Sequence, residues 1–216
     1  MAEMSGGLPR RFVLAGLAVL AARPALGQSH DHGHGQHQGH HGVAKPASTS
    51  HDRLATQFGG PFTLTDHTGK RVSDADYRGR FMLVYFGFTR CVDTCPIDIP
   101  TIAQALDAIG PLAERVAPLF VTVDPAHDTV ETIKPYVEAF HPRLIGLTGS
   151  EPEIAAVAKA YKVHRRKLTQ HHGHGEYGVD HGSLTYLMGP DGRFVTLLPH
   201  NSGAERLAAV MRKYLA

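Results

Sequence analysis

A continuous apolar run of strand length, Phe81–Phe86 (FMLVYF), constrains the fold of this chain more than any other feature of its sequence. A run without alternating polar residues indicates a strand that is buried on both faces, as in sheets that are covered by helices. Val116–Val123 is interpreted as the next buried strand, and between the two strands apolar residues recur at helical spacing from Ile97 to Ile109. This pattern predicts an α/β fold.

The rest of residues 54–216 continues the alternation of strands and helices. Phe62-Thr63-Leu64 with Thr68-Gly69-Lys70 predicts a short hairpin, and Gly189–Gly192 (GPDG) predicts the turn of a second hairpin. Further strands are expected around Leu144-Ile145, Val163-His164, Leu184–Leu187 and Phe194–Leu198. Capping boxes predict three helix starts, at Asp128-x-x-Glu131, Ser150-x-x-Glu153 and Ser202-x-x-Glu205. The order βαβαβαββα predicts a thioredoxin-like sandwich, in which helices flank a central mixed β-sheet that carries an N-terminal β-hairpin extension.

The first 27 residues have the pattern of an export signal. Arg10-Arg11 form a positive segment, Phe12–Ala22 is apolar, and Ala25-Leu26-Gly27 offers small residues for cleavage. The apolar run is shorter than the roughly 18–20 residues that span a bilayer, so a cleaved signal peptide is favoured over an uncleaved membrane anchor. The arginine pair leaves the twin-arginine and the ordinary secretory routes both open. We therefore expect a periplasmic protein with no transmembrane span in the mature chain.

A histidine-rich segment follows over residues 28–53, with much Gly, Gln and Ser and little that could be buried. Such a segment cannot offset the entropy of its own ordering, so we predict a disordered arm before a folded domain over residues 54–216. The arm is interpreted as a metal-scavenging or buffering segment, with an inert linker as the alternative. Its accessory metal ligands would be His30, His32, His34, His37, His40 and His41.

The chain has two cysteines, Cys91 and Cys95, which follow the first buried strand after a short loop. Cys95-Pro96 is expected to open the next helix, where the positive end of the helix dipole favours a thiolate. The C-x-x-x-C spacing lets both sulfur atoms point to one side and hold a single ion. A structural disulfide is less favoured, because a bridge between such close residues removes little entropy from the unfolded chain. A redox-active pair, which usually has two intervening residues, is the stronger alternative.

Four sequence blocks resemble the Sco (SenC) family, in the same order along the chain. The blocks are Gly87–Pro96 (GFTRCVDTCP), Val121–Pro125 with Asp128-Thr129, Tyr136–Gly149 through Phe140-His141-Pro142, and Val179–Ser183 with Tyr186-Leu187-Met188 and Asp191-Gly192. Val92 departs from the pattern, because many relatives have proline there, and the His-bearing stretch before His181 is longer. The family binds Cu(I) or Cu(II) and delivers it to the dinuclear copper A centre of cytochrome c oxidase. The resemblance therefore implies a copper site made of Cys91, Cys95 and His181.

Two thiolates and one imidazole form a soft set of ligands that suits copper. A dedicated zinc site would need a fourth ligand, and the sequence has no third cysteine. Asp93 and Asp180 flank the ligands and are interpreted either as residues that tune the site or as turn and cap residues. His127 and His141, each near a proline, are interpreted as structural. Further accessory ligands would be His171, His172 and His174, for which a solvated, variable loop is the alternative.

These predictions indicate a copper metallochaperone, which is a binding and transfer protein rather than an enzyme. Its partners would be the oxidase subunit that carries copper A and an exported thiol reductant that keeps the cysteines reduced. The alternative is a thiol–disulfide oxidoreductase that acts on cysteines of the oxidase subunit, with Cys91 as the attacking thiol. A thiol peroxidase has no support beyond the fold. A nucleic-acid partner is excluded, because the chain has a formal net charge of +2 and no basic stripe.

Overall fold

The computed structural model describes residues 56–168 and 178–216 of the chain. The predicted signal peptide over residues 1–27, the predicted arm over residues 28–53, and the candidate ligands His171, His172 and His174 lie outside the described residues. The predicted domain boundaries therefore stay predictions. Within the described residues, no helix combines the length and the apolar character that crossing a membrane requires.

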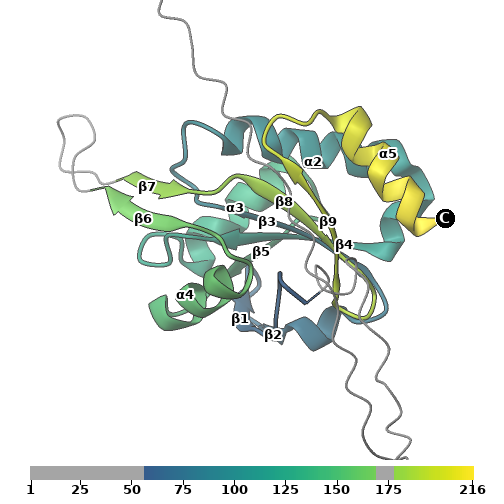
Figure 1. The fold of residues 1–216 in the computed structure, drawn as a ribbon. Coiled ribbons are helices and arrows are strands. Elements are labelled where there is room, and N and C mark those ends of the chain that lie inside the picture. Colours follow the sequence, from purple (N-terminus) through teal and green to yellow (C-terminus); the bar gives the residue numbers. More distant parts are fainter. Residues whose placement is uncertain (1–55, 169–177) are drawn as a thin grey trace, which may run out of the picture. The chain divides into compact units, whose positions relative to one another are not determined.

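A seven-stranded mixed sheet forms the centre of the fold (Figure 1). Strand β4 runs parallel to β3 and β5, whereas the β1–β2 and β8–β9 hairpins add antiparallel strands at the two sides. In spatial order the strands are β2 (Arg71–Ser73), β1 (Thr63–Asp66), β5 (Ile145–Thr148), β4 (Val116–Thr122), β3 (Phe81–Gly87), β8 (Leu184–Met188) and β9 (Phe194–Pro199). The mixed sheet and its N-terminal hairpin confirm the predicted architecture.

Helices cover the faces of this sheet. The connections from β3 to β4 and from β4 to β5 step across the sheet in the same direction, and right-handed crossovers place α2 and α3 on one face. Figure 1 shows α5 beside α2, and α4 at the other side of the sheet. The helices are α2 (Cys95–Ile109), α3 (Val130–Phe140), α4 (Glu151–Ala160) and α5 (Ala204–Leu215), with two short 3-10 helices, η1 (Asp74–Tyr77) and η2 (Gly110–Arg115).

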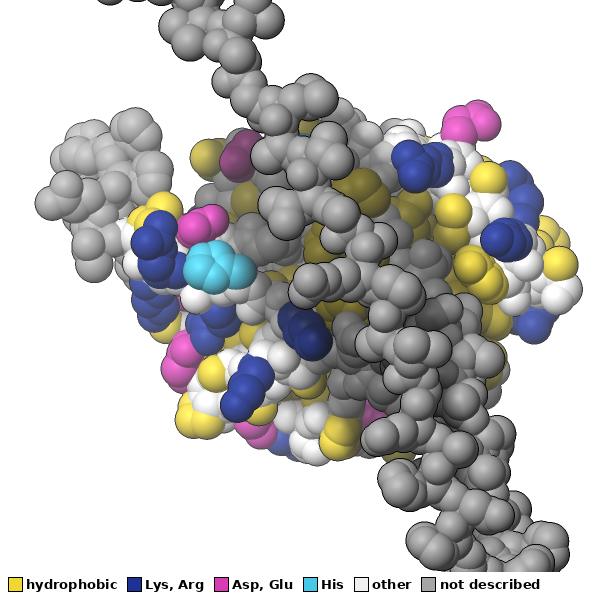
Figure 2. Space-filling model, viewed as in Figure 1, with side chains coloured by type: hydrophobic (Ala, Val, Ile, Leu, Met, Phe, Trp, Pro, Cys, Tyr) yellow, Lys and Arg dark blue, Asp and Glu magenta, His cyan; other side chains and the backbone are white. Residues whose placement is uncertain are grey.

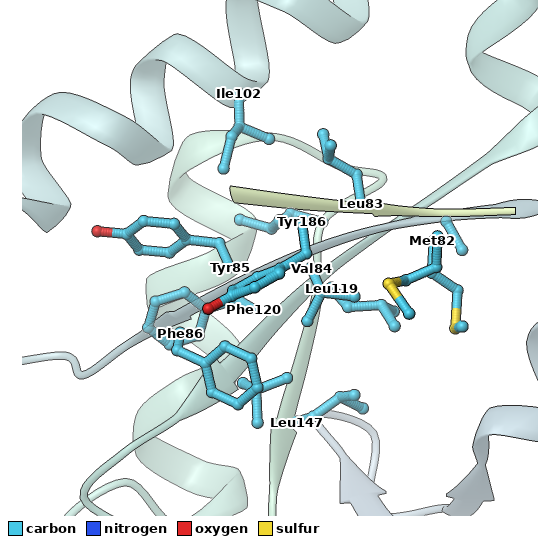
Figure 3. Packing of buried hydrophobic residues seen from close by; sticks show 14 of the residues in the cluster. Met82, Leu83, Val84, Tyr85, Phe86, Ile102, Leu119, Phe120, Leu147 and Tyr186 are labelled. Atoms are coloured by element: carbon cyan, nitrogen blue, oxygen red, sulfur yellow. The ribbon is translucent and has the colours of Figure 1, made fainter. Parts of the chain in front are cut away.

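Strands β3 and β4 form the middle of the hydrophobic core. Every residue of both strands is buried, as the continuous apolar run predicts. Figure 3 shows their side chains packed together with those from α2 and β8, among them Leu83, Leu119, Ile102 and Tyr186. This packing fixes the end of β3, and therefore it also fixes the start of the loop that carries Cys91.

One of the three predicted capping boxes is present. Helix α4 begins after Ser150, whose backbone N–H donates to the carboxylate of Glu153 at 2.7 Å in the expected reciprocal arrangement. The box predicted at Asp128 is wrong, because Thr129 is the N-cap of α3. The Asp128 carboxylate accepts hydrogen bonds from other segments, including one of 2.7 Å from the hydroxyl group of Thr122, so it does not cap the helix.

The start of α5 also differs from the prediction. Its N-cap is Gly203, with a φ of 80°, a left-handed conformation that glycine adopts without strain. The hydroxyl group of Ser202 donates to the carbonyl group of Pro199 at 2.7 Å. The capping box predicted at Ser202 is therefore wrong, because the turn after β9 uses this hydroxyl group.

A two-stranded sheet outside the main sheet was not predicted. Strand β6 (Arg165–Leu168) begins two residues after the strand start expected at Val163, and it pairs antiparallel with β7 (Gly178–His181). The two segments read RRKL and GVDH, so neither has the apolar alternation of a typical strand. Among the described residues, β6 and β7 pair only with each other. They extend away from the main sheet in Figure 1, and Lys and Arg side chains gather over them in Figure 2.

Candidate metal centre

Cys91 and Cys95 lie where the central sheet meets helix α2. Strand β3 ends at Gly87, and α2 begins at Cys95 with Thr94 as its N-cap. Between them, the N–H of Cys91 donates to the carbonyl group of Phe88 at 3.1 Å and closes a turn. Both cysteines are free thiols, with exposed fractions of 8% for Cys91 and 0% for Cys95. The two sulfur atoms are therefore not joined by a disulfide in this structure, and both are shielded from bulk water.

Strand β7 brings His181 to the two thiols. His181 is the last residue of β7, and one donor atom each of Cys91, Cys95 and His181 lie within 4.8 Å of one another. In the described part of the chain, this is the one group of three or more such side chains that could hold a metal ion. The Nδ1 atom of His181 lies 3.2 Å from the carbonyl oxygen of Gly182, so its N–H donates there. Nε2 is left to bind a metal ion.

Phe88 packs against the imidazole ring. The ring centroids of Phe88 and His181 are 5.8 Å apart, and the ring planes meet at 81° in an edge-to-face contact. Such contacts favour a defined ring orientation. The loop between β3 and α2 therefore supplies both Cys91 and an aromatic surface that orients the third side chain of the group.

The two thiols share one proton in the reduced protein. A hydrogen bond from Cys95 lowers the pKa of Cys91 from 9.0 to about 3, and His181 and the backbone N–H groups of Cys95 and Asp93 act in the same direction, although burial opposes them. The interaction with Cys91 also raises the pKa of Cys95, and burial and the negative charge of Cys91 add to this effect. Cys91 is therefore the thiolate of the pair, and Cys95 is the thiol that donates to it.

A buried carboxylate holds the loop that precedes Cys91. Asp128 is 0% exposed and accepts hydrogen bonds from the hydroxyl and N–H groups of Thr89, at 2.6 and 3.0 Å. It also accepts the bond from Thr122 on β4, so the carboxylate is satisfied away from water. Asp128 thus ties the chain two residues before Cys91 to the end of the neighbouring strand.

Gly87 leaves room for the sulfur atom of Cys95. A Cβ atom at this position would lie 2.7 Å from the Cys95 Sγ atom and 2.8 Å from the ring of Phe120. Neither distance is compatible with an undisturbed side chain. The need for glycine therefore comes from the close approach of Cys95, not from backbone conformation.

Asp93 and Asp180, the two acidic residues that flank the candidate ligands, have different surroundings in the described structure. The Asp180 carboxylate lies 3.5 Å from His164 and 3.6 Å from Arg166, and its side chain is 46% exposed. Asp93 is exposed and contributes its backbone N–H to the environment of Cys91. A tuning role for either carboxylate stays a prediction.

His127 and His141 make contacts that agree with a structural role. The Nδ1 atom of His141, a buried residue, accepts a hydrogen bond of 3.1 Å from the N–H of Arg143. The Nδ1 atom of His127 lies 3.2 Å from the carboxylate of Asp128. Both rings therefore serve local packing and loop geometry.

Several residues around the sulfur atoms were missed or misinterpreted in the sequence. Two of these residues could have been found from the sequence. Tyr85 has the one hydroxyl group within an apolar run, and a carboxylate near a buried strand, such as that of Asp128, needs hydrogen-bond partners. The residues are Tyr85, Gly87, Phe88, Thr94 and Asp128.

Comparison with known proteins gives consistent matches. The family model described as SCO1/SenC matches residues 50–216. The human protein SCO1 homolog, mitochondrial, is 41% identical over 160 residues, which are 73% of this chain and 53% of the human protein. Protein sco1 of Schizosaccharomyces pombe is 40% identical over 160 residues, which are 73% of this chain and 61% of that protein. The chain thus spans between half and two thirds of the length of these relatives.

A solved structure agrees with the fold. ScoI of Bradyrhizobium japonicum, solved with copper bound, matches with a TM-score of 0.67 and 41% identity over 73% of this chain and 99% of that chain. The match confirms the predicted thioredoxin-like sandwich.

Proposed function

The chain belongs to the SCO1/SenC family, and from this premise we propose that it is a copper metallochaperone that holds one copper ion on Cys91, Cys95 and His181. Copper is its cargo, which it passes to the dinuclear copper A centre of cytochrome c oxidase. The observation that carries the proposal is the convergence of two sulfur atoms and an imidazole within 4.8 Å. Two thiolates suit Cu(I), and the imidazole adds a ligand that helps to hold Cu(II).

The proton shared by the cysteines supports this role. Metal ligands must be deprotonated, and Cys91 already is, so the pair releases only the Cys95 proton when copper binds. A partner that offers its own thiolates can then take the ion by ligand exchange, without a change in its oxidation state. The copper A subunit is the proposed acceptor, and an exported thiol reductant keeps the donor cysteines reduced.

The N-terminal segments complete the proposal. We assign residues 1–27 to a signal peptide, residues 28–53 to a metal-buffering arm and residues 54–216 to the copper domain, in a periplasmic protein. The apolar run after Arg10-Arg11 supports export, and six histidines among glycines support the arm.

The test of this function is copper binding followed by transfer. The reduced protein is expected to bind one equivalent of Cu(I) on the cysteines in addition to any ions held by the histidine arm. Cys91→Ser or Cys95→Ser should therefore each lower the bound copper by one equivalent, as measured by metal analysis after gel filtration. Incubation of the loaded protein with the copper-free soluble domain of the oxidase subunit should transfer two Cu(I) ions to that domain, and removal of one electron with ferricyanide should then produce the absorption of mixed-valence copper A. Equal copper contents in the Cys91→Ser/Cys95→Ser double variant and the unsubstituted protein would contradict the proposed site.

A thiol–disulfide oxidoreductase is the second candidate, favoured by the thiolate of Cys91 beside the thiol of Cys95. Cys91 would attack a disulfide of the oxidase subunit and form a mixed disulfide, and Cys95 would then displace the second target thiol. The target disulfide is reduced to two thiols, and Cys91 and Cys95 are oxidised to a disulfide.

His181→Ala separates the two functions. We expect Cu(II) affinity to fall at least about tenfold, because even residues that support a metal ligand cost that much when removed. Disulfide reduction should continue, since the hydrogen bond from Cys95 is the largest influence on Cys91. Competition with a copper chelator and an assay with a model disulfide measure the two outcomes.

His164→Ala is the matched control, because His164 precedes the same hairpin and its side chain is 66% exposed. It should leave both activities unchanged. Equal loss of copper affinity in both variants would show that His181 is not a ligand.

A further inference from the structure

Tyr85 is a buried phenol inside the apolar strand β3. It is 1% exposed, and Figure 3 shows its hydroxyl group pointing away from the other labelled side chains of the cluster. A buried hydroxyl group needs a hydrogen-bond partner. In the described structure its partners are the Oγ1 atom of Thr94 at 3.4 Å and the sulfur atom of Cys95 at 3.8 Å.

Thr94 extends this contact to the second sulfur atom. Its Oγ1 atom lies 3.8 Å from the sulfur atom of Cys91, so each cysteine has one hydroxyl group beside it. Each hydroxyl group has a single proton to donate. The proton of Tyr85 can therefore go to Thr94 or to Cys95, but not fully to both.

A bound copper ion makes Cys95 the better acceptor for the Tyr85 hydroxyl group. As a copper ligand, Cys95 is a thiolate, and hydrogen bonds to an ionised group are the stronger ones. Cys95 is 0% exposed, so water does not compete, and the remaining donor is the backbone N–H of Phe88.

We propose that Tyr85 is a positioning residue of the copper site, whose hydroxyl group donates a hydrogen bond to the Cys95 sulfur atom in the copper-loaded protein. The inference rests on the proposed function. A hydrogen bond to a thiolate withdraws electron density from the sulfur atom and so weakens its donation to copper. Because Cu(II) depends on this donation more than Cu(I) does, Tyr85 raises the reduction potential of the bound ion.

Tyr85→Phe removes the hydroxyl group and keeps the ring. We expect one equivalent of copper to bind, the sulfur-to-Cu(II) absorption band to move to longer wavelength, and the reduction potential to fall. Tyr186→Phe is the matched control, because Tyr186 is also 1% exposed and packs on the neighbouring strand β8. It should leave the band and the potential where they are in the unsubstituted protein.

A second variant distinguishes the loss of the hydrogen bond from a change in packing. A ring-fluorinated tyrosine at position 85 keeps the hydroxyl group and makes it a stronger donor, so the band and the potential should move in the opposite direction. A role in packing alone would not reverse the sign.

Three outcomes are informative. Shifts of opposite sign in the two Tyr85 variants support the inference. Copper-loaded Tyr85→Phe with an unchanged band and potential would overturn it and leave the chaperone function intact. Failure of the unsubstituted protein to bind copper would instead overturn the proposed function, and the inference with it.

Discussion

Iodoacetamide is expected to alkylate Cys91 of the metal-free, reduced protein at a nearly constant rate from about pH 5 to about pH 9. The reaction needs the thiolate, and the hydrogen bond from Cys95 lowers the pKa of Cys91 to about 3, so the thiolate is fully formed over this range. An ordinary cysteine, with a pKa of about 8.5, would lose reactivity roughly tenfold for each pH unit below that value. Between about pH 8 and about pH 5 the two profiles therefore diverge by nearly three orders of magnitude.

The pH profile carries this prediction, not the absolute rate. A thiolate of low pKa is intrinsically a weaker nucleophile, and Cys91 is only 8% exposed. Mass spectrometry of digests should find the label on Cys91, because Cys95 keeps its proton. The same chain unfolded in guanidinium chloride is the control and should show the ordinary profile at both cysteines. A folded protein whose rate falls tenfold per pH unit would contradict the shared proton.

Gly87→Ala is expected to remove most of the copper affinity and to destabilise the fold. The new methyl group would lie 2.7 Å from the Cys95 Sγ atom, 2.8 Å from Phe120 and 3.0 Å from Tyr85. All three neighbours are buried, so the methyl group can be accommodated only by moving the sulfur atom or the core. Overpacking of this kind costs about 1–3 kcal/mol of unfolding free energy. Displacement of a ligand should lower copper affinity at least about a hundredfold, more than the loss of a supporting residue would.

Gly182→Ala is a closely matched control for this substitution. Gly182 follows His181 directly, and a Cβ atom there would meet nothing within 4 Å. Chemical denaturation and copper competition should find this variant equal to the unsubstituted protein. If Gly87→Ala bound copper as tightly as Gly182→Ala, the close approach at Cys95 would not limit the site.

The sequence predicts the central strands and the cysteine pair because both depend on local patterns. The run Phe81–Phe86 is buried on both faces, as its composition requires, and α2 begins at Cys95. Proline at the first turn and the spacing of the two cysteines were enough to predict a shared site at this junction. The resemblance to a family then indicated His181, which no local pattern would connect to the cysteines.

Features that depend on contacts between distant segments could not be predicted in this way. Strand β7 has no alternating pattern and forms because β6 pairs with it. Asp128 has the spacing of a helix cap, but its carboxylate has better partners in Thr89 and Thr122. The proximity of Tyr85 to Cys95 depends on how α2 packs on β3, which the sequence alone does not specify.

The two-stranded sheet of β6 and β7 holds the imidazole of His181 in place by other interactions than those that hold the two sulfur atoms. His181 pairs with Arg165 across the two strands. Arg165 connects this sheet to the rest of the domain, because it donates to the carbonyl group of Val123 and forms an ion pair with Glu151 at 2.5 Å. The imidazole is thus tethered through charges that respond to ionic strength, whereas the sulfur atoms are embedded in the core. Loss of these contacts of Arg165 would lower the number of protein ligands of the copper ion from three to two and leave the two sulfur ligands in place. The copper affinity therefore depends in part on the contact between Arg165 and Glu151, outside the hydrophobic core.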